Sequence, residues 1–233
     1  MAFLFEVLGD ALDALAGGLG GDLWGVLGLT LIVGGSATVI GVAIGIPLGT
    51  TLGLYRFPGH RAVLLSVNTG MAIPPVLAGL LLLLLVWRDG VLGSWGILFT
   101  PAAMITAQAL LALPIAAGVT AGAIGGLPAA ASEQLAALRL APMHRSLVAI
   151  REAWPGVAAG VAAAFGRVIS EVGAVLIVGG NIRGETRVLT TAIVQEARQT
   201  NFGAALAFGF VLLLLALTVN AALTWLQLRE QPR

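Results

Sequence analysis

The chain has 233 residues, of which 58% are hydrophobic and only 10% are charged, and its mean hydropathy is +1.00. A soluble domain carries roughly 25% charged residues, so this composition excludes a soluble fold and indicates a protein embedded in lipid. The net charge of +1, without any basic tract, excludes a nucleic-acid-binding protein. Cysteine is absent, which excludes disulfides and thiolate metal sites.

The basic residues indicate a chain that does not hydrolyse ATP. All twelve are arginine, and there is no lysine. A P-loop places a lysine on the β- and γ-phosphates of its nucleotide, so a conventional P-loop ATPase is excluded, as is Schiff-base chemistry. We therefore expect a protein that is not an enzyme by itself, that holds no cofactor, and that receives any energy from ATP through a partner.

Five stretches predict membrane-spanning helices, because a span requires about 20 mostly apolar residues. They lie at residues 24–54, 62–87, 101–124, 155–180 and 203–226. The sequence thus predicts an all-α integral membrane protein of about five transmembrane helices, with one transmembrane domain over residues 23–228. Before the first span, residues 1–22 place Phe5, Leu8 and Leu12 at helical spacing with acidic residues between them, which predicts a short amphipathic helix at the outer interface.

The distribution of arginines predicts the orientation. With five spans and a cytoplasmic carboxyl terminus, seven arginines are cytoplasmic and four are external. The cytoplasmic ones are Arg56, Arg61, Arg139, Arg145, Arg151, Arg229 and Arg233, and the external ones are Arg88, Arg183, Arg187 and Arg198. This excess fits the positive-inside rule. We expect a multi-pass protein of the plasma or inner membrane, with the amino terminus outside and residues 229–233 as a cytoplasmic tail.

Glycines and prolines inside the spans predict how the helices pack and bend. Gly41, Gly45, Gly49 and Gly53 recur every fourth residue, a spacing that lets helix backbones approach closely. It predicts either general close packing or a dimer interface. The Pro74-Pro75 step removes helical hydrogen bonds, and it predicts either a packing bend or a break that lines a pathway.

Residues 127–154 form a cytoplasmic segment between the third and fourth spans, which we call the coupling segment. We expect Ser132 to cap a short helix that runs through Arg139 and is broken by Pro142, followed by a second helix from about residue 144 to 154. Such a crosswise helix suits docking on another protein, although an ordinary polar connector is the alternative.

Within the coupling segment, the stretch Ser-Glu-Gln-Leu-Ala-Ala-Leu-Arg-Leu-Ala-Pro at residues 132–142 resembles the coupling loop of binding-protein-dependent ABC importer permeases. Leu135 stands where this family usually has glutamate, and Ala141 stands where it has glycine. The resemblance implies a type I importer fold in which this helix inserts into an ATPase subunit. The contacting residues it implies are Glu133, Ala136, Ala137, Arg139, Leu140, Ala141 and Pro142.

Arg167 and Glu171 are four residues apart inside the fourth span, so the sequence predicts that they share one helix face. A charge in a span costs at least ~2.5 kcal/mol and usually pairs or faces a cavity. Three alternatives follow. The two residues form an ion pair that lowers the insertion cost, they line an anion pathway with Glu171 orienting Arg167, or Glu171 relays protons.

The sequence around this pair carries the most specific resemblance. Residues 166–173 read Gly-Arg-Val-Ile-Ser-Glu-Val-Gly and residues 179–184 read Gly-Gly-Asn-Ile-Arg-Gly. Both resemble the oxyanion branch of these permeases, and most closely its tungstate members, with similarity over about residues 24–226. The resemblance implies a translocation pathway lined by Pro74, Pro75, Arg167, Ser170, Glu171 and Asn181.

Hydrogen-bond donors gather at the outer end of the fourth span, where they suit either anion entry or docking of a binding protein. They are Arg183, Thr186, Arg187, Thr190 and Thr191. The resemblance further implies the partners: a second copy of the chain, two ATP-binding cassette subunits, an extracytoplasmic oxyanion-binding protein and the lipid bilayer. Tungstate is the expected cargo, with molybdate or another oxyanion as the alternative. An ion-coupled secondary carrier, usually built from internal repeats that we do not find here, and a purely structural membrane subunit are the rivals from other classes.

Overall fold

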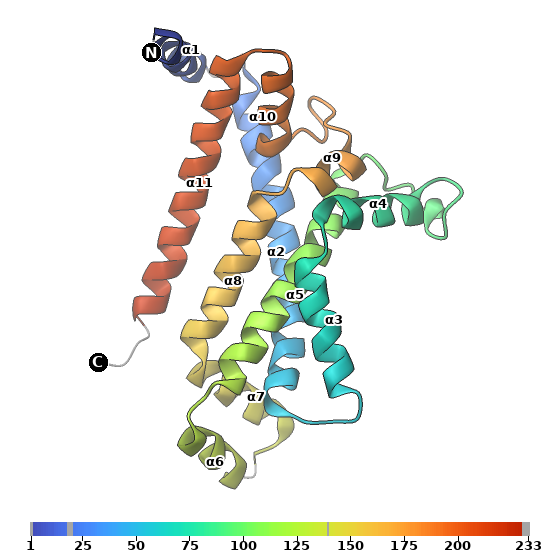
Figure 1. Cartoon of the computed structure of the whole chain (residues 1–233), viewed down its shortest axis with the longest axis vertical. Helices are drawn as coiled ribbons and strands as arrows, with labels where there is room; N and C mark the ends of the chain where they lie inside the picture. The colour runs from blue at the N-terminus through green and yellow to red at the C-terminus, as the bar shows by residue number, and fades with distance from the viewer. Residues whose placement is uncertain (1, 18–20, 139, 230–233) are drawn as a thin grey trace. The chain divides into compact units, whose positions relative to one another are not determined.

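The computed structural model describes residues 2–17, 21–138 and 140–229, and every regular element in these residues is helical (Figure 1). The elements are α1 (Ala2–Ala16), α2 (Leu23–Leu54), α3 (His60–Ala72), α4 (Pro75–Val86), the 3-10 turn η2 (Gly93–Trp95), α5 (Pro101–Gly125), α6 (Ala129–Ala137), α7 (Pro142–Glu152), α8 (Trp154–Ile169), α9 (Gly173–Gly179), α10 (Leu189–Arg198) and α11 (Phe202–Arg229). The predicted fold class, an all-α membrane protein, is confirmed.

Three of the described helices, α2, α5 and α11, are long and apolar enough to cross a membrane. The number rises to five if each of two broken helix pairs, α3 with α4 and α7 with α8, counts as one span. The predicted span at residues 155–180 is wrong as a single helix. The first part of that stretch belongs to α8, which ends at Ile169, and a separate short helix, α9, begins at Gly173.

The predicted bend at Pro74-Pro75 is present as a complete break in the helix. Ile73 and Pro74 both adopt extended backbone angles, with ψ of 125° and 126°. A residue that precedes proline is disfavoured in the α region, which accounts for Ile73. Pro75 then opens α4 at a position where its missing N–H costs nothing.

The described helices form two compact units. The first comprises residues up to 37, 74–108 and 169–219, and the second comprises residues 38–73, 109–168 and those from 220 onward. In the second unit, α5 contacts α2, α3 and α8 through glycines. A Cβ atom built at Gly45 would lie 2.7 Å from Cβ of Ala116, one at Gly70 would lie 2.9 Å from Cβ of Pro114, and one at Gly156 would lie 2.5 Å from Cβ of Ala123. Only glycine permits these approaches.

The glycine repeat of α2 is therefore used inside the chain. A Cβ atom at Gly41 would lie 2.5 Å from Cβ of Ala112, and one at Gly53 would lie 2.8 Å from Cβ of Ile124, both in α5. Close packing, the first of our two interpretations, is confirmed, and this glycine repeat does not supply a dimer interface.

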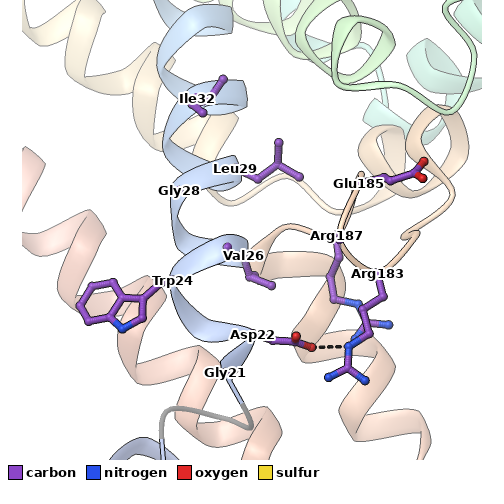
Figure 2. Close-up of a pocket in the computed structure, with 12 residues that line it drawn as sticks. Gly21, Asp22, Trp24, Val26, Gly28, Leu29, Ile32, Arg183, Glu185 and Arg187 are labelled. Atoms are coloured by element: carbon purple, nitrogen blue, oxygen red, sulfur yellow. Dashed lines mark ion pairs between the residues drawn. The ribbon is translucent and has the colours of Figure 1, made fainter.

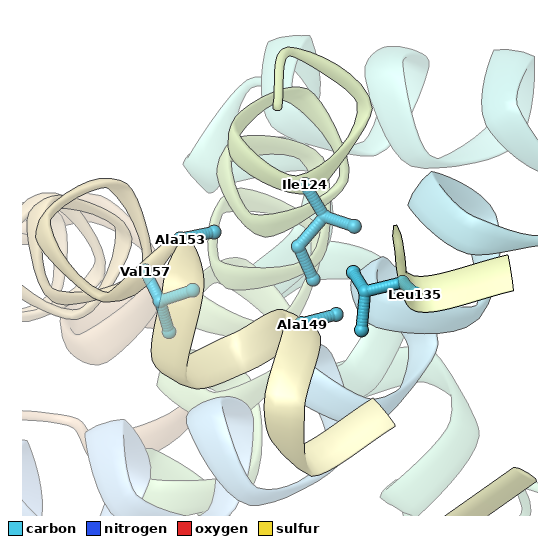
Figure 3. Packing of buried hydrophobic residues seen from close by; sticks show 5 residues of the cluster. All are labelled: Ile124, Leu135, Ala149, Ala153 and Val157. Carbon is cyan, nitrogen blue, oxygen red and sulfur yellow. The ribbon is translucent and has the colours of Figure 1, made fainter. Parts of the chain in front are cut away.

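The coupling segment is held to the second unit by an apolar cluster. Its buried members come from α5, α6, α7, the residue between α7 and α8, and α8, and Figure 3 shows them converging. They are Ile124, Leu135, Ala149, Ala153 and Val157. The coupling segment thus has its own core contacts and is not a loose connector.

In the first unit, α9 lies against α4. A Cβ atom at Gly79 of α4 would lie 2.6 Å from Cα of Ala174, and one at Gly173 of α9 would lie 2.5 Å from the side chain of Val76. A second cluster, with Val26, Leu189, Ala192 and Phe208 buried, joins α2, α10 and α11.

The predicted amphipathic helix is present as α1. The ring of Phe3 lies edge-on to that of Phe202 at 6.2 Å, and a Cβ atom at Gly203 would lie 2.5 Å from Cβ of Asp10. α1 therefore packs on the start of α11, while Phe5 and Leu12 remain exposed. Its place at a membrane interface stays a prediction.

Candidate functional site

The two helices of the coupling segment begin at residues other than those we predicted. α6 begins at Ala129, after Pro128 in an extended conformation, and not at Ser132. The reason is that three alanines, the best helix formers, precede Ser132. α7 begins at Pro142 itself rather than near residue 144, because proline is well suited to the first turn of a helix. Pro142 therefore starts the second helix.

Within the coupling segment, the side chains divide into a buried and an exposed set. Leu135 is only 5% exposed and belongs to the apolar cluster. This explains why an apolar residue is tolerated where the resembling loops have glutamate. Leu138, Met143 and Leu147 are exposed, Met143 by 69%. Contiguous exposed apolar side chains are typical of interaction surfaces, so a protein contact at these three residues stays a prediction.

Of the predicted contact residues in the coupling segment, the exposed ones are Glu133, Ala137, Ala141 and Pro142, and Leu140 is half-buried. Arg139 lies outside the described residues, and the side chain of Ala136 is not described. At the other end of the segment, α7 meets α8 at an angle of 81°, so α7 runs crosswise to the membrane helix that it precedes.

The prediction that Arg167 and Glu171 share one helix face is wrong, because α8 ends between them, at Ile169, whereas an ion pair between the two side chains stays a prediction. Glu171 lies in the break, is only 7% exposed, and accepts a hydrogen bond of 3.0 Å from the N–H of Ala174 on Oε1. An acidic side chain that bonds a nearby backbone N–H competes with helical hydrogen bonding. This contact caps α9 and offers a physical reason for the break. Arg167 is half-buried near the end of α8, and Ser170 is exposed in the break.

The threonines that we expected to face an anion or a docking protein are used inside the fold, which corrects that prediction. Thr186, Thr190 and Thr191 are all buried. Their hydroxyl groups donate to backbone carbonyls: Thr186 to Gly179, Thr190 to Glu171, and Thr191 to Val188. Since each hydroxyl has one proton, none of the three offers it to an external anion in this conformation.

Asn181 is held in an unusual backbone conformation next to these threonines. Its φ is +54°, directly after Gly180 at +72°. Asparagine tolerates this left-handed region better than most residues. Its Oδ1 is buried and has no hydrogen-bond partner among the described residues. This leaves one polar atom of the predicted pathway set available to a ligand or to water.

Arg183 forms an ion pair with Asp22, which directly precedes α2 (Figure 2). The hydrogen bond that Arg183 donates to Asp22, and then the negative charge of that carboxylate, raise the pKa of Arg183 above its already high ordinary value. No pattern in the sequence indicates this pair, because its partners are 161 positions apart.

Arg187 lies beside Arg183 on the loop that leads to α10, and its buried Nε has no partner among the described residues. Both arginines line a cavity of about 410 Å³, together with Trp24 and Glu185, and a second cavity of about 440 Å³ that includes Glu196. Two guanidinium groups are suited to an oxyanion, but the carboxylates of Asp22, Glu185 and Glu196 reduce the positive potential there. The arrangement suits transient contact with an anion rather than its tight capture.

No group of three or more histidine, aspartate or glutamate residues in the described part of the chain could hold a metal ion.

Comparison with known proteins decides the class of this membrane bundle. Residues 45–231 match the model of the family described as the binding-protein-dependent transport system inner membrane component. The chain belongs to this family. The match includes the coupling segment, the break at Glu171 and the arginine-bearing loop, so the resemblance inferred from residues 132–142 and 166–184 is confirmed.

Individual relatives within this class extend over most of the chain. A probable anion ABC transporter permease of Haloferax volcanii is 40% identical over 201 residues, which are 84% of this chain and 87% of the relative. The tungstate uptake system permease TupB of Peptoclostridium acidaminophilum is 35% identical over 206 residues, 88% of this chain and 90% of the relative. The molybdenum transport system permease ModB of Mycobacterium bovis is 29% identical over 200 residues, which are 82% of this chain and 75% of the relative.

Proposed function

We propose that this chain is the permease subunit of an ATP-driven importer for an oxyanion, and that its cargo is tungstate. The observation that carries this proposal is the 35% identity to a tungstate uptake permease over 88% of the chain. Relatives described as anion and molybdenum permeases support the same class of cargo. Tungstate and molybdate have nearly the same size and charge, so direct measurement has to separate them.

In this proposal the working unit contains two copies of the chain, two ATPase subunits bound on the cytoplasmic side, and a binding protein outside. The amino terminus is external, and the cytoplasmic face is that of the coupling segment. The exposed side chains of Leu138, Met143 and Leu147 contact the ATPase. Leu135 and Ala149 pack with α5 and α8, so a displacement of the coupling segment is carried into both membrane helices.

On the external side, Arg183 and Arg187 meet the binding protein or the released anion. In this proposal the pathway through the membrane uses the helix breaks at Pro74-Pro75 and at Glu171, and Arg167, Ser170 and Asn181 are its other lining residues. Irregular backbone at membrane depth is tolerated where it lines a cavity or is buried in protein, which supports this assignment.

The decisive test of this function is reconstitution. The chain is co-expressed with its ATPase subunit, purified, placed in liposomes and mixed with a binding protein loaded with tungstate or molybdate. We expect a stable complex whose ATP turnover is stimulated more strongly by the tungstate-loaded protein. Equal or greater stimulation by molybdate would overturn the cargo, and uptake without an ATPase would overturn the class.

A second experiment tests the docking surface. Met143→Glu/Leu147→Glu should abolish co-purification with the ATPase, because two charges enter an apolar interface. The matched control is Val91→Glu/Trp95→Glu, which places the same two charges at residues that are 87% and 62% exposed outside the coupling segment. Unchanged co-purification of the double variant would remove α7 from the interface.

A further inference from the structure

The turn that joins α2 to α3 carries positive charge without compensation. Arg56 and Arg61 flank it, and the sequence contains no acidic residue from Leu23 through Arg88. Among the residues that the structure describes, neither arginine has a carboxylate within ion-pairing distance. Two guanidinium groups that face solvent or lipid without a counter-charge favour an anionic ligand.

These two arginines line a cavity of about 680 Å³, whose other walls are Phe57, Gly59, His60 and Leu64. The cavity is polar at the turn and apolar toward Leu64. The next residue of α3, Leu65, is 67% exposed. The cavity therefore combines cationic groups with an apolar side, as an amphipathic ligand requires.

His60 fixes the position of Arg56. The imidazole is buried, and its Nε2 lies 2.9 Å from the carbonyl oxygen of Leu52, at the end of α2. Nη1 of Arg56 lies 3.0 Å from Nε2 and 3.4 Å from Nδ1 of the same ring, and when Nε2 donates to the Leu52 carbonyl, Nδ1 is the nitrogen that accepts from Arg56. The ring of Phe57 packs edge-on against the imidazole at 5.4 Å. Arg56 is thus oriented before any ligand arrives, which reduces the entropy lost on binding.

The turn lies between one apolar helix of spanning length and the helix pair that begins with α3. In a family of inner membrane components, such a turn falls near the boundary between hydrocarbon and water, where lipid phosphates are found. Basic pockets between membrane helices bind anionic lipid headgroups.

We propose that the α2–α3 turn binds the phosphate group of an anionic membrane lipid between Arg56 and Arg61, with the acyl chain along Leu64 and Leu65. Nothing in this argument depends on the cargo or on the direction of transport. The site also adjoins the coupling segment, because the guanidinium carbon of Arg145 in α7 lies 5.3 Å from the ring centroid of Tyr55, next to Arg56. Lipid bound at the turn stabilises this contact between the turn and α7.

Native mass spectrometry of the purified full chain in detergent tests the proposal, with phosphatidylglycerol as the probe and phosphatidylcholine for comparison. We expect the wild-type protein to retain phosphatidylglycerol preferentially. Arg56→Gln/Arg61→Gln should lower its apparent affinity about tenfold or more, since each tenfold corresponds to ~1.4 kcal/mol. The control Arg88→Gln/Arg198→Gln removes the same total charge from exposed residues elsewhere and should retain wild-type affinity.

Arg61→Gln alone keeps the test decisive if the double variant does not fold, because Arg61 has no hydrogen-bond or ion-pair partner among the described residues. We expect this single variant to lose less affinity for phosphatidylglycerol than the double variant does, with unchanged thermal stability. Equal loss in the control variant, or no loss in either Arg61 variant, would overturn the site.

A further arm of the experiment adds sodium phosphate and sodium tungstate in the low millimolar range. If either displaces phosphatidylglycerol completely, the turn is a site for free anions and the lipid assignment is wrong.

Discussion

The hydroxyl group of Thr190 in α10 donates a hydrogen bond of 2.9 Å to the main-chain carbonyl of Glu171, in the break between α8 and α9. The side chain of Glu171 in turn accepts from the N–H of Ala174. Backbone groups at a helix break inside a membrane protein need partners, because lipid supplies none. Two side chains provide them here, so the break is a stable feature of the fold.

Thr190→Val should therefore destabilise the protein. Valine has nearly the same shape but leaves the carbonyl of Glu171 without its donor, and an unsatisfied buried group costs about 1–3 kcal/mol. Thermal unfolding in detergent measures the loss, and Thr190→Ser, which keeps the hydroxyl, should lose clearly less. A valine variant as stable as the wild-type protein would show that the carbonyl finds another partner.

Replacements of Glu171 separate its alternative roles. Glu171→Gln keeps an oxygen that accepts from Ala174, whereas Glu171→Leu removes the cap, with an expected cost of about 1 kcal/mol. We expect the glutamine variant to support ATP-driven uptake in reconstituted liposomes and the leucine variant to be impaired. Loss of uptake in a stably folded glutamine variant would favour a role for the charge itself, either in the pathway or in a proton relay.

The glycine contacts between α2 and α5 predict a position-specific effect. Gly45→Ala inserts a methyl group 2.7 Å from Cβ of Ala116, and overpacking of this kind costs about 1–3 kcal/mol. Gly35→Ala in the same helix meets nothing within 4 Å, so it serves as the control and should leave the melting temperature nearly unchanged. Similar shifts in the two variants would mean that the helices separate easily at this contact.

Leu135 offers a test of how the coupling segment is held. Leu135→Ala removes a buried side chain from the cluster with Ala149 and Val157, at a cost of about 2–5 kcal/mol if the cavity stays open. We expect ATP turnover in the reconstituted complex to continue while transport falls, because the coupling segment no longer moves with α5 and α8. Leu138→Ala, at an exposed position of the same segment, should preserve the stability of the chain. Transport unaffected by Leu135→Ala would show that this cluster does not transmit the movement.

Most of the membrane topology could be predicted from the sequence, because long apolar runs with few charges specify spans directly. The details of the site could not. Helical spacing placed Arg167 and Glu171 together, yet it contains no information about the backbone N–H that Glu171 caps. Similarly, composition marks Thr186 and Thr190 as donors but cannot reveal that carbonyls of Gly179 and Glu171 already occupy them.

Contacts between residues that are distant in the chain also could not be predicted from the sequence. A glycine repeat is equally suited to an internal and an intermolecular interface, and only the position of α5 decides between them. The ion pair of Asp22 and Arg183 joins the start of α2 to a loop far along the chain. No local pattern predicts such a pair.

This ion pair leads to a prediction about pH and salt. Asp22 raises the pKa of Arg183, and a raised pKa stabilises the folded protein below the ordinary arginine value, with loss only as the pH rises beyond it. Arg183 therefore stays charged throughout the range in which the protein can be handled. Its contribution to the free energy of unfolding should not change between about pH 6 and 9, well below the ordinary arginine pKa.

Because the side chain of Arg183 is 65% exposed, solvent and salt screen its pairing with Asp22. We expect Arg183→Gln to have little effect on thermal unfolding at any pH in this range.

Arg187→Gln should instead reduce the ATP turnover stimulated by the loaded binding protein, because the Nε of Arg187 is not already occupied by an internal partner among the described residues. Asp22→Asn should raise that stimulation at low salt, since it releases Arg183 for an external anion, and the increase should fade as salt is added. A fall in stimulation on Asp22→Asn would mean that the pair instead holds the loop in the shape that the binding protein recognises.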